Sequence, residues 1–316
     1  MRVLVTGASG NIATALIPRL LERGHTVRGL VRPTSRSDQL KAWGVELHQG
    51  DLTDRESLRG VADGIEAVFH LGGALWAADE AYLRRANVDG ARWLGEECAN
   101  GEARRFIFTS FPQVLGPTFE PTPEDAPARA VGNHARWKLE AEELLLALHR
   151  EGQLAVTVLR LGTVYGPDMR IIDLYRRLLR LRVMATFGWG RYLTHFVHIE
   201  DVVQGLLLAL TSERSAGRVY NICDDRPVPH RTFVNLLAER LGVWHPWPAP
   251  VLAFRAAATF ASLASLIVRQ PPALTQDVIT MATVPYWADT SRARAELGFA
   301  PKYPTVEEGI GTCCRV

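Results

Sequence analysis

"RVLVTGASGNIATALIPRLLERG", residues 2–24, is the most informative part of the sequence for the fold. It begins with a short apolar run of β-branched residues, which is typical of a buried strand, and ends with apolar residues at helical spacing. The glycines between the two let backbone amides approach a pyrophosphate, and a helix N-terminus favours its negative charge. The stretch therefore predicts a phosphate-binding strand–turn–helix unit. The residues expected at the phosphates are Gly7, Ser9, Gly10, Asn11 and Ile12.

The first half of the chain continues to alternate between strand and helix patterns. Strands are expected near 25–32, 45–52, 67–73, 104–110 and 154–162, and helices between them include one over 54–64. This alternation predicts an α/β fold, a Rossmann doubly wound parallel sheet. After about residue 165 the pattern loosens. We expect a dinucleotide-binding domain over 1–165 and a smaller C-terminal substrate lobe over 166–316, with segments that return to the sheet.

The bulk composition excludes several classes of protein. With 316 residues, 47% of them hydrophobic, and a net charge of +2, the chain argues against nucleic-acid binding. Its four cysteines show no CxxC spacing, so a reduced cytoplasmic protein is expected, and the short apolar run at the N-terminus is no signal peptide. The apolar segment 250–268 is interpreted as a packed helix, with a membrane-facing surface as the less favoured alternative.

The end of the second expected strand selects the cofactor. An acid there would bind the ribose hydroxyls of NAD, whereas an arginine accommodates the 2′-phosphate of NADP. The chain offers "GLVRPTSR", with Arg32 and no acid before Asp38, so NADP is favoured over NAD. In "GDL", at the end of the third strand, Asp51 and Leu52 are expected at the adenine. A helix N-cap is the alternative role for Asp51.

Several motifs, in order, resemble those of the extended short-chain dehydrogenase/reductases, the NAD-dependent epimerase/dehydratase superfamily. They are "TGASGNIA", "GDLTD", "FHLGG", "NVDGA", "RLGTVYGP", "FVHIEDVV" and "GRVYNI". "LVRPTS" and the apolar late lobe are most similar to the branch of dihydroflavonol reductases, 3β-hydroxysteroid dehydrogenases and hopanoid-associated epimerases. Members of this family use a serine, a tyrosine and a lysine. The resemblance implies an NAD(P)-dependent enzyme and a homodimer formed partly by the helix that carries the lysine.

Two of these three catalytic positions differ here. "TSFPQVLG" places Phe111 at the serine position, and "HARWK" places His134 at the tyrosine position while it retains Lys138. Lys138 is expected to bind the nicotinamide ribose. For His134 three interpretations stay open: direct acid–base catalysis, hydrogen bonding to substrate or cofactor, and a helix residue with no functional role. The charge of Lys138 should depress the pKa of His134.

The residues around these positions indicate an apolar substrate. Phe111 cannot donate a hydrogen bond and favours a flat or greasy molecule. Thr109 shares a strand face with Phe111 and is a candidate for the surviving hydroxyl, whereas Ser110 should point to the other face. Tyr165, the nearest tyrosine in sequence, is assigned with Phe111 to the substrate pocket.

Three functions remain open from the sequence. The first is an NADP-dependent oxidoreductase of a hydrophobic ketone or alcohol, such as a polyketide, terpenoid, steroid-like or aromatic molecule. The second is an epimerase, dehydratase, isomerase or cyclase, including a nucleotide-sugar epimerase, for which Arg160, Arg170, Arg191 and Arg218 are candidate diphosphate ligands. The third is a non-catalytic NADP-binding sensor. No metal site is expected, because His195, His198 and Asp201 are read as a structural motif.

Overall fold

A seven-stranded, wholly parallel sheet forms the centre of the computed structural model, which describes residues 1–75, 79–268 and 274–314. Its strand order is β11-β6-β5-β4-β1-β2-β3. The strands are β1 (Arg2–Thr6), β2 (Thr26–Val31), β3 (Glu46–Gln49), β4 (Ala67–His70), β5 (Arg105–Ser110), β6 (Ala155–Leu161) and β11 (Val219–Ile222). The order reverses between β1 and β4, which opens a crevice at the carboxyl ends of these strands. The predicted doubly wound Rossmann sheet is confirmed.

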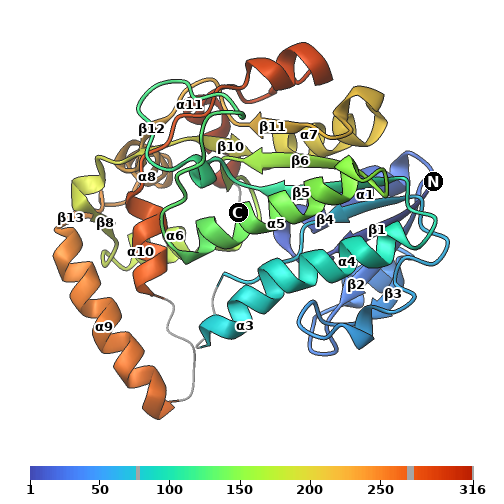
Figure 1. Cartoon of the computed structure of the whole chain (residues 1–316). Helices are drawn as coiled ribbons and strands as arrows, with labels where there is room; N and C mark the ends of the chain where they lie inside the picture. The colour runs from blue at the N-terminus through green and yellow to red at the C-terminus, as the bar shows by residue number, and fades with distance from the viewer. Residues whose placement is uncertain (76–78, 269–273, 315–316) are drawn as a thin grey trace.

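Helices cover both faces of this sheet, as Figure 1 shows. On one face, α1 (Asn11–Glu22) and α7 (Ile199–Thr211) pack side by side and bury residues such as Leu16 and Leu206. On the other face, α4 (Gly90–Ala99) and α5 (Asn133–Arg150) bury residues such as Leu94 and Ala141. Because both faces are covered, the strands carry continuous apolar runs rather than alternating ones.

One expected helix is absent. Residues 54–64 form only a 3₁₀ turn, Glu56–Leu58, followed by further turns. Gly60 and Gly64 adopt φ angles of +71° and +65°, in the left-handed region that ends a right-handed helix. These two glycines therefore prevent the helix that apolar spacing alone predicts. A short helix, α2 (Asp38–Ala42), forms between β2 and β3.

The later part of the chain builds a smaller lobe from short strand pairs and helices. The pairs are β7 (Thr163–Tyr165) with β10 (Phe196–His198), β8 (Ala185–Phe187) with β13 (Trp247–Ala249), and β9 (Leu193–Thr194) with β12 (Val228–Pro229). The helices are α6 (Arg170–Arg180), α8 (His230–Leu241), α9 (Val251–Val268), α10 (Gln276–Thr283) and α11 (Val306–Gly309). The boundary predicted at residue 165 stays a prediction, although α7 and β11 lie in the layers of the central sheet.

The expectation of a packed helix over 250–268 is wrong in one respect. The helix α9 forms, but of its described side chains only Ala258 is fully buried, while Leu252 is 77% and Phe260 72% exposed. Figure 1 shows α9 extending away from the body of the molecule. Within the described residues, no helix is both long enough and apolar enough to cross a bilayer.

Candidate active site

The turn between β1 and α1 has the geometry of a phosphate cradle. Gly7 adopts a φ of +62°, and a Cβ atom there would lie 2.9 Å from Gly72 Cα at the end of β4. Gly10 begins α1 without a capping side chain, so the first amides of the helix have no side-chain partner. Only glycine fits the close approach of the two strand ends. The residues present therefore fit a dinucleotide pyrophosphate.

Most of the predicted cofactor residues line one cleft of about 250 Å³. The structure brings together Gly7, Ser9, Gly10, Arg32, Asp51 and Leu52. Asn11 and Ile12 are not among its lining residues. The Asn11 side chain donates a hydrogen bond of 2.6 Å to Asp168 O, and Ile12 packs against the core beneath the helix. Any contact of these two residues with a phosphate would therefore be made by their backbone amides.

The adenosine end of the cleft carries Arg32 and Ser35 at the end of β2. The Arg32 Nη1 atom lies 3.4 Å from the Tyr82 hydroxyl, and Tyr82 also lines the cleft. Sequence reasoning missed Tyr82, which comes from a helix fifty residues further along the chain. Asp51 accepts bonds from the amide and hydroxyl of Thr53, so it holds its own turn as well as facing the cleft.

A buried asparagine joins this cleft to the helix that carries Lys138. Asn87 lies in a π-helical turn, Arg85–Asp89, between α3 (Glu80–Arg84) and α4. Its side chain accepts from Ala74 N at 3.2 Å and donates to Ala74 O at 2.8 Å. A Cβ atom on Gly73 would lie 2.7 Å from Asn87 Oδ1 and 3.9 Å from Lys138 Nζ. The "FHLGG" and "NVDGA" motifs thus meet at one point, beside Lys138.

Lys138 points from α5 toward the end of β5. Its Nζ atom donates to Thr109 O at 2.9 Å and lies 4.5 Å from the centre of the Phe108 ring. Burial lowers the pKa of Lys138 to about 8, and the Glu142 carboxylate acts in the opposite direction. Lys138 therefore stays charged at neutral pH but holds its proton less firmly than an exposed lysine does.

His134 and Phe111, the two departures from the family pattern, lie against each other. Their ring centroids are 5.2 Å apart and the planes are inclined by only 15°, so the rings stack. His134 is buried, and this burial, followed by the charge of Lys138, lowers its pKa to about 3. The imidazole is therefore neutral at physiological pH, as the sequence led us to expect, and cannot serve as a stored imidazolium acid.

A carboxylate from the C-terminal lobe fixes the start of α5. Asp277 on α10 accepts hydrogen bonds from Asn133 N at 2.8 Å and His134 N at 3.1 Å. Gly132 precedes them with a φ of +88°, and a Cβ atom there would lie 2.7 Å from the Asp277 carboxylate. Negative charge at a helix N-terminus is stabilising. Asp277 therefore positions His134, although nothing in the local sequence indicates this contact.

The other residues predicted at the site have different roles. The Thr109 hydroxyl donates to His70 O at 3.1 Å inside the sheet, so it is occupied rather than free for a substrate. Tyr165 is 1% exposed, packs against Phe196 and Phe233, and donates to Thr305 O at 3.3 Å. This position in the core of the C-terminal lobe argues against the pocket role predicted for Tyr165. Phe111 is the predicted pocket residue that lies beside His134.

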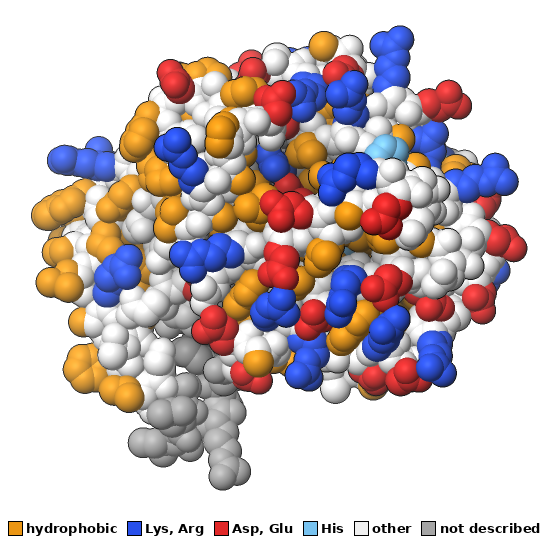
Figure 2. Space-filling view, in the orientation of Figure 1, with side chains coloured by type: hydrophobic (Ala, Val, Ile, Leu, Met, Phe, Trp, Pro, Cys, Tyr) orange, Lys and Arg blue, Asp and Glu red, His pale blue; other side chains and the backbone are white. Residues whose placement is uncertain are grey.

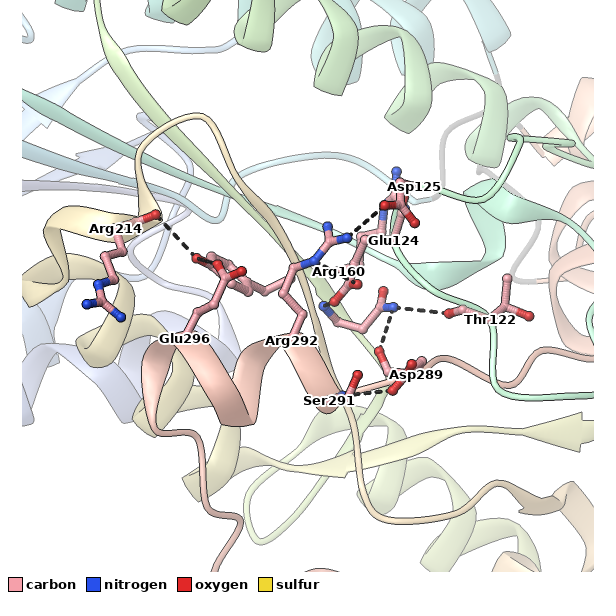
Figure 3. Close-up of polar contacts among 11 residues, drawn as sticks. Thr122, Glu124, Asp125, Arg160, Arg214, Asp289, Ser291, Arg292 and Glu296 are labelled. Carbon is pink, nitrogen blue, oxygen red and sulfur yellow. Dashed lines mark hydrogen bonds and ion pairs between the residues drawn. The ribbon is translucent and has the colours of Figure 1, made fainter.

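Arg160, a candidate diphosphate ligand, is committed to the protein interior. Its guanidinium donates to the buried carboxylate of Glu142 at 2.7 Å and to Glu124 O at 2.9 Å. Figure 3 shows the surrounding network, in which Arg292 points toward Asp125. These contacts tie the loop after β5 to the end of the chain. A buried arginine whose guanidinium already donates to two protein groups is unsuited to hold a substrate phosphate.

The late histidines are also held by the protein. His195 Nε2 lies 2.8 Å from Asp224 O, and its Nδ1 accepts from Ala288 N at 3.2 Å. His198 Nδ1 accepts from Glu200 N at 3.2 Å, and its Nε2 lies 2.9 Å from the Thr312 hydroxyl. With all four ring nitrogens engaged, these bonds support the structural role inferred from the sequence.

Comparison with known proteins agrees with this geometry. Residues 3–223 match the model of the NAD dependent epimerase/dehydratase family. The chain is 32% identical to the 4-hydroxy-2-methyl-3-oxo-4-farnesyl-3,4-dihydroquinoline-1-oxide ketoreductase of Stigmatella aurantiaca, over 98% of this chain and 95% of the relative. It is 28% identical to the 2-alkyl-3-oxoalkanoate reductase of Stenotrophomonas maltophilia, over 98% and 97%. The solved UDP-glucose 4-epimerase of Thermotoga maritima superposes with a TM-score of 0.81 at 25% identity, over 99% and 97%.

Proposed function

The chain belongs to the NAD dependent epimerase/dehydratase family, and on that premise we propose that it is an NADP-dependent reductase of a ketone that carries a large apolar group. The observation that carries this proposal is the stacked pair of Phe111 and His134 beside Lys138. The pair presents a flat apolar ring and a neutral imidazole where other members carry two hydroxyls. Such a surface suits a carbonyl group on a hydrophobic molecule.

The names of the relatives suggest which ketone to test first. The Stigmatella and Stenotrophomonas enzymes are both named for substrates with an oxo group at carbon 3 and an alkyl substituent at carbon 2. We propose a 3-oxo compound with a 2-alkyl substituent for this chain. Arg32 and Ser35 at the end of β2, where an acid would be needed to bind NAD, support NADP as the cofactor.

In the proposed reaction the carbonyl carbon receives a hydride and the carbonyl oxygen receives a proton. Bound NADPH would supply the hydride. The N–H group of neutral His134 donates a hydrogen bond to the carbonyl oxygen as negative charge develops there, because the imidazolium is not populated at neutral pH. Lys138 holds the ribose of the cofactor. With a pKa of about 8, Lys138 is also the group best suited to supply the proton that the carbonyl oxygen receives, through a hydroxyl or a water.

Two replacements of His134 test this role. His134→Phe keeps a ring against Phe111 and removes the N–H donor, whereas His134→Gln keeps a donor and removes the ring. We expect His134→Phe to lower kcat for NADPH oxidation by roughly 10²-fold, with the Kd for NADPH unchanged, and His134→Gln to retain more activity. Tight NADPH binding without oxidation by any 2-alkyl-3-oxo or other lipophilic ketone would refute the proposal.

Epimerisation with no net redox change is the second candidate, favoured by the match to a UDP-glucose 4-epimerase over nearly the whole chain. The commitment of Arg160 to Glu142 weighs against a nucleotide-sugar substrate. A titration with UDP-glucose separates the two functions, since an epimerase should bind it and a lipid-ketone reductase should not. The homodimer and the cytoplasmic location stay predictions.

A further inference from the structure

We propose that the tip of the C-terminal lobe is a surface that docks on an anionic lipid bilayer. The tip consists of the outer face of α9 together with the edge formed by β8, β13 and the residues that flank these strands. This inference goes beyond the proposed function, because neither the cleft nor His134 requires such a surface. It rests on exposed apolar side chains and an excess of positive charge that lie together.

The outer face of α9 is apolar and open to solvent. Leu252, Phe260 and Leu263 are 77%, 72% and 57% exposed, and their spacing along the helix places them within one arc of its surface. The opposite side holds α9 to the lobe, where the ring centroids of Phe254 and Phe187 are 4.2 Å apart and Ala258 is fully buried. The helix is therefore anchored on one side and presents large apolar groups on the other.

The strand edge next to α9 adds exposed tryptophans. Trp244 and Trp247 are 55% and 56% exposed and lie 6.0 Å apart between ring centroids. Trp247 belongs to β13, which pairs with β8 and ends immediately before α9. Leu181 and Val183, just before β8, are 60% and 62% exposed. Tryptophan prefers the headgroup level of a bilayer, whereas leucine and phenylalanine reach the acyl boundary.

The same part of the chain is strongly basic. Residues 170–192 contain six arginines and one acid, and residues 231–255 contain three arginines and one acid, although the whole chain has a net charge of only +2; of these arginines, Arg170 lines the cofactor cleft rather than the tip. Both acids have partners of their own, since Asp173 pairs with Arg176 and Glu239 lies 3.7 Å from His245. The Arg182 guanidinium lies over the Trp244 ring at 5.9 Å. Positive charge is thus set directly beside the apolar groups.

Charge decides between the possible occupants of this surface. A second copy of the same tip would bring arginines against arginines, which is unfavourable. A bilayer with anionic headgroups satisfies the arginines and the apolar side chains together. In Figure 2 hydrophobic side chains gather over the α9 side of the molecule, with Lys and Arg side chains among them. Because no described helix can span a membrane, the tip would lie on the bilayer.

Vesicle co-sedimentation tests the proposal on the whole chain, without any measurement of catalysis. We expect binding to mixed vesicles of phosphatidylglycerol and phosphatidylcholine, binding at least tenfold weaker to phosphatidylcholine alone, and loss of binding in high salt. Phe260→Glu combined with Leu263→Glu should weaken binding roughly tenfold or more. Phe119→Glu is the matched control, because Phe119 is 70% exposed but lies on the loop after β5, outside the tip. It should bind as the wild type does.

Three outcomes would overturn the proposal. They are no co-sedimentation with either kind of vesicle, an equal loss of binding in the Phe119→Glu control, and conversion of an oligomer to a monomer by the Phe260→Glu and Leu263→Glu pair without any vesicle binding by the wild type. The last would show that the tip is an interface between copies of the chain. A circular dichroism melt of each variant establishes that a loss of binding is not a loss of folding.

Discussion

The pH dependence of NADPH use should report Lys138 rather than His134. In the free protein the pKa of Lys138 is about 8 and that of His134 about 3, both lowered first by burial. Lys138 is thus charged below pH 8 and neutral above it, whereas His134 is neutral throughout the usable range. If the charged lysine holds the cofactor, kcat/KM for NADPH should be level from pH 6 to 7 and fall above pH 8.

The size of the fall follows from the same pKa. With a value of about 8, the charged fraction of Lys138 is roughly 0.91 at pH 7 and roughly 0.09 at pH 9, so kcat/KM should drop about tenfold between them. A histidine acting as an imidazolium acid with its ordinary pKa of about 6.5 would instead cause a roughly tenfold fall between about pH 5.5 and 7.5. The two mechanisms therefore differ by about 1.5 pH units in the position of the break.

The assay is the initial rate of NADPH oxidation at limiting NADPH, measured from pH 6 to 10 for the wild type and two variants. Lys138→Arg keeps the charge at every pH tested and should abolish the break, even if the plateau is lower. His134→Gln should lower the plateau and leave the break in place. A wild-type break near pH 6.5 that disappears in His134→Gln would refute the assignment of roles.

Three further predictions follow from named contacts. Arg32→Ala should weaken NADPH binding by roughly 10- to 100-fold and leave NADH binding nearly unchanged, as measured by fluorescence titration, because a charge-assisted bond to the 2′-phosphate is lost. Asp224 is fully buried, and burial, followed by the charge of Asp201, raises its pKa to about 8, so the folded state keeps a proton that the unfolded state releases. The free energy of unfolding should therefore decrease as pH rises from about 4 to 8, by up to about 1.4 kcal/mol per pH unit, and urea titrations of Asp224→Asn should show a weaker dependence. Asp277→Ala removes the acceptor of two amides and should cost about 1–2 kcal/mol of stability and reduce kcat, whereas Asp277→Asn, which keeps one acceptor, should cost less. Equal effects of the two Asp277 variants would contradict the capping role.

The phosphate cradle was predictable because its determinants are local. Gly7, Gly10 and the start of α1 lie within one short stretch, and strand–turn–helix geometry follows from residue type and spacing. The turn over 54–64 was predictable in principle, since Gly60 and Gly64 interrupt the helical pattern, but apolar spacing was given more weight. Residues 250–268 are apolar over the length of a helix, and a helix that is apolar on nearly all sides looks the same in sequence whether it is buried or exposed.

Contacts made at long range could not be read from the sequence. Asp277 lies 143 residues after His134, and Arg160 meets Glu142 across two elements, so only the folded chain reveals the cap and the buried ion pair. The fate of Tyr165 has the same cause. As the nearest tyrosine in sequence it is assigned to the pocket, but the packing of Phe196 and Phe233 around it places it in the core of the lobe.

The two departures at positions 111 and 134 form one physical unit, and this bears on how the chemistry is arranged. A serine at position 111 has no ring face to offer, so the stack at 5.2 Å requires the phenylalanine. Burial of His134 in this stack, beside a charged Lys138, is what keeps the imidazole neutral. A phenol at the same place would have its pKa lowered by that lysine and would exchange a proton itself. The replacement pair therefore removes the usual proton carrier and leaves Lys138, with its pKa of about 8, as the titratable group of the trio that changes charge nearest to neutral pH.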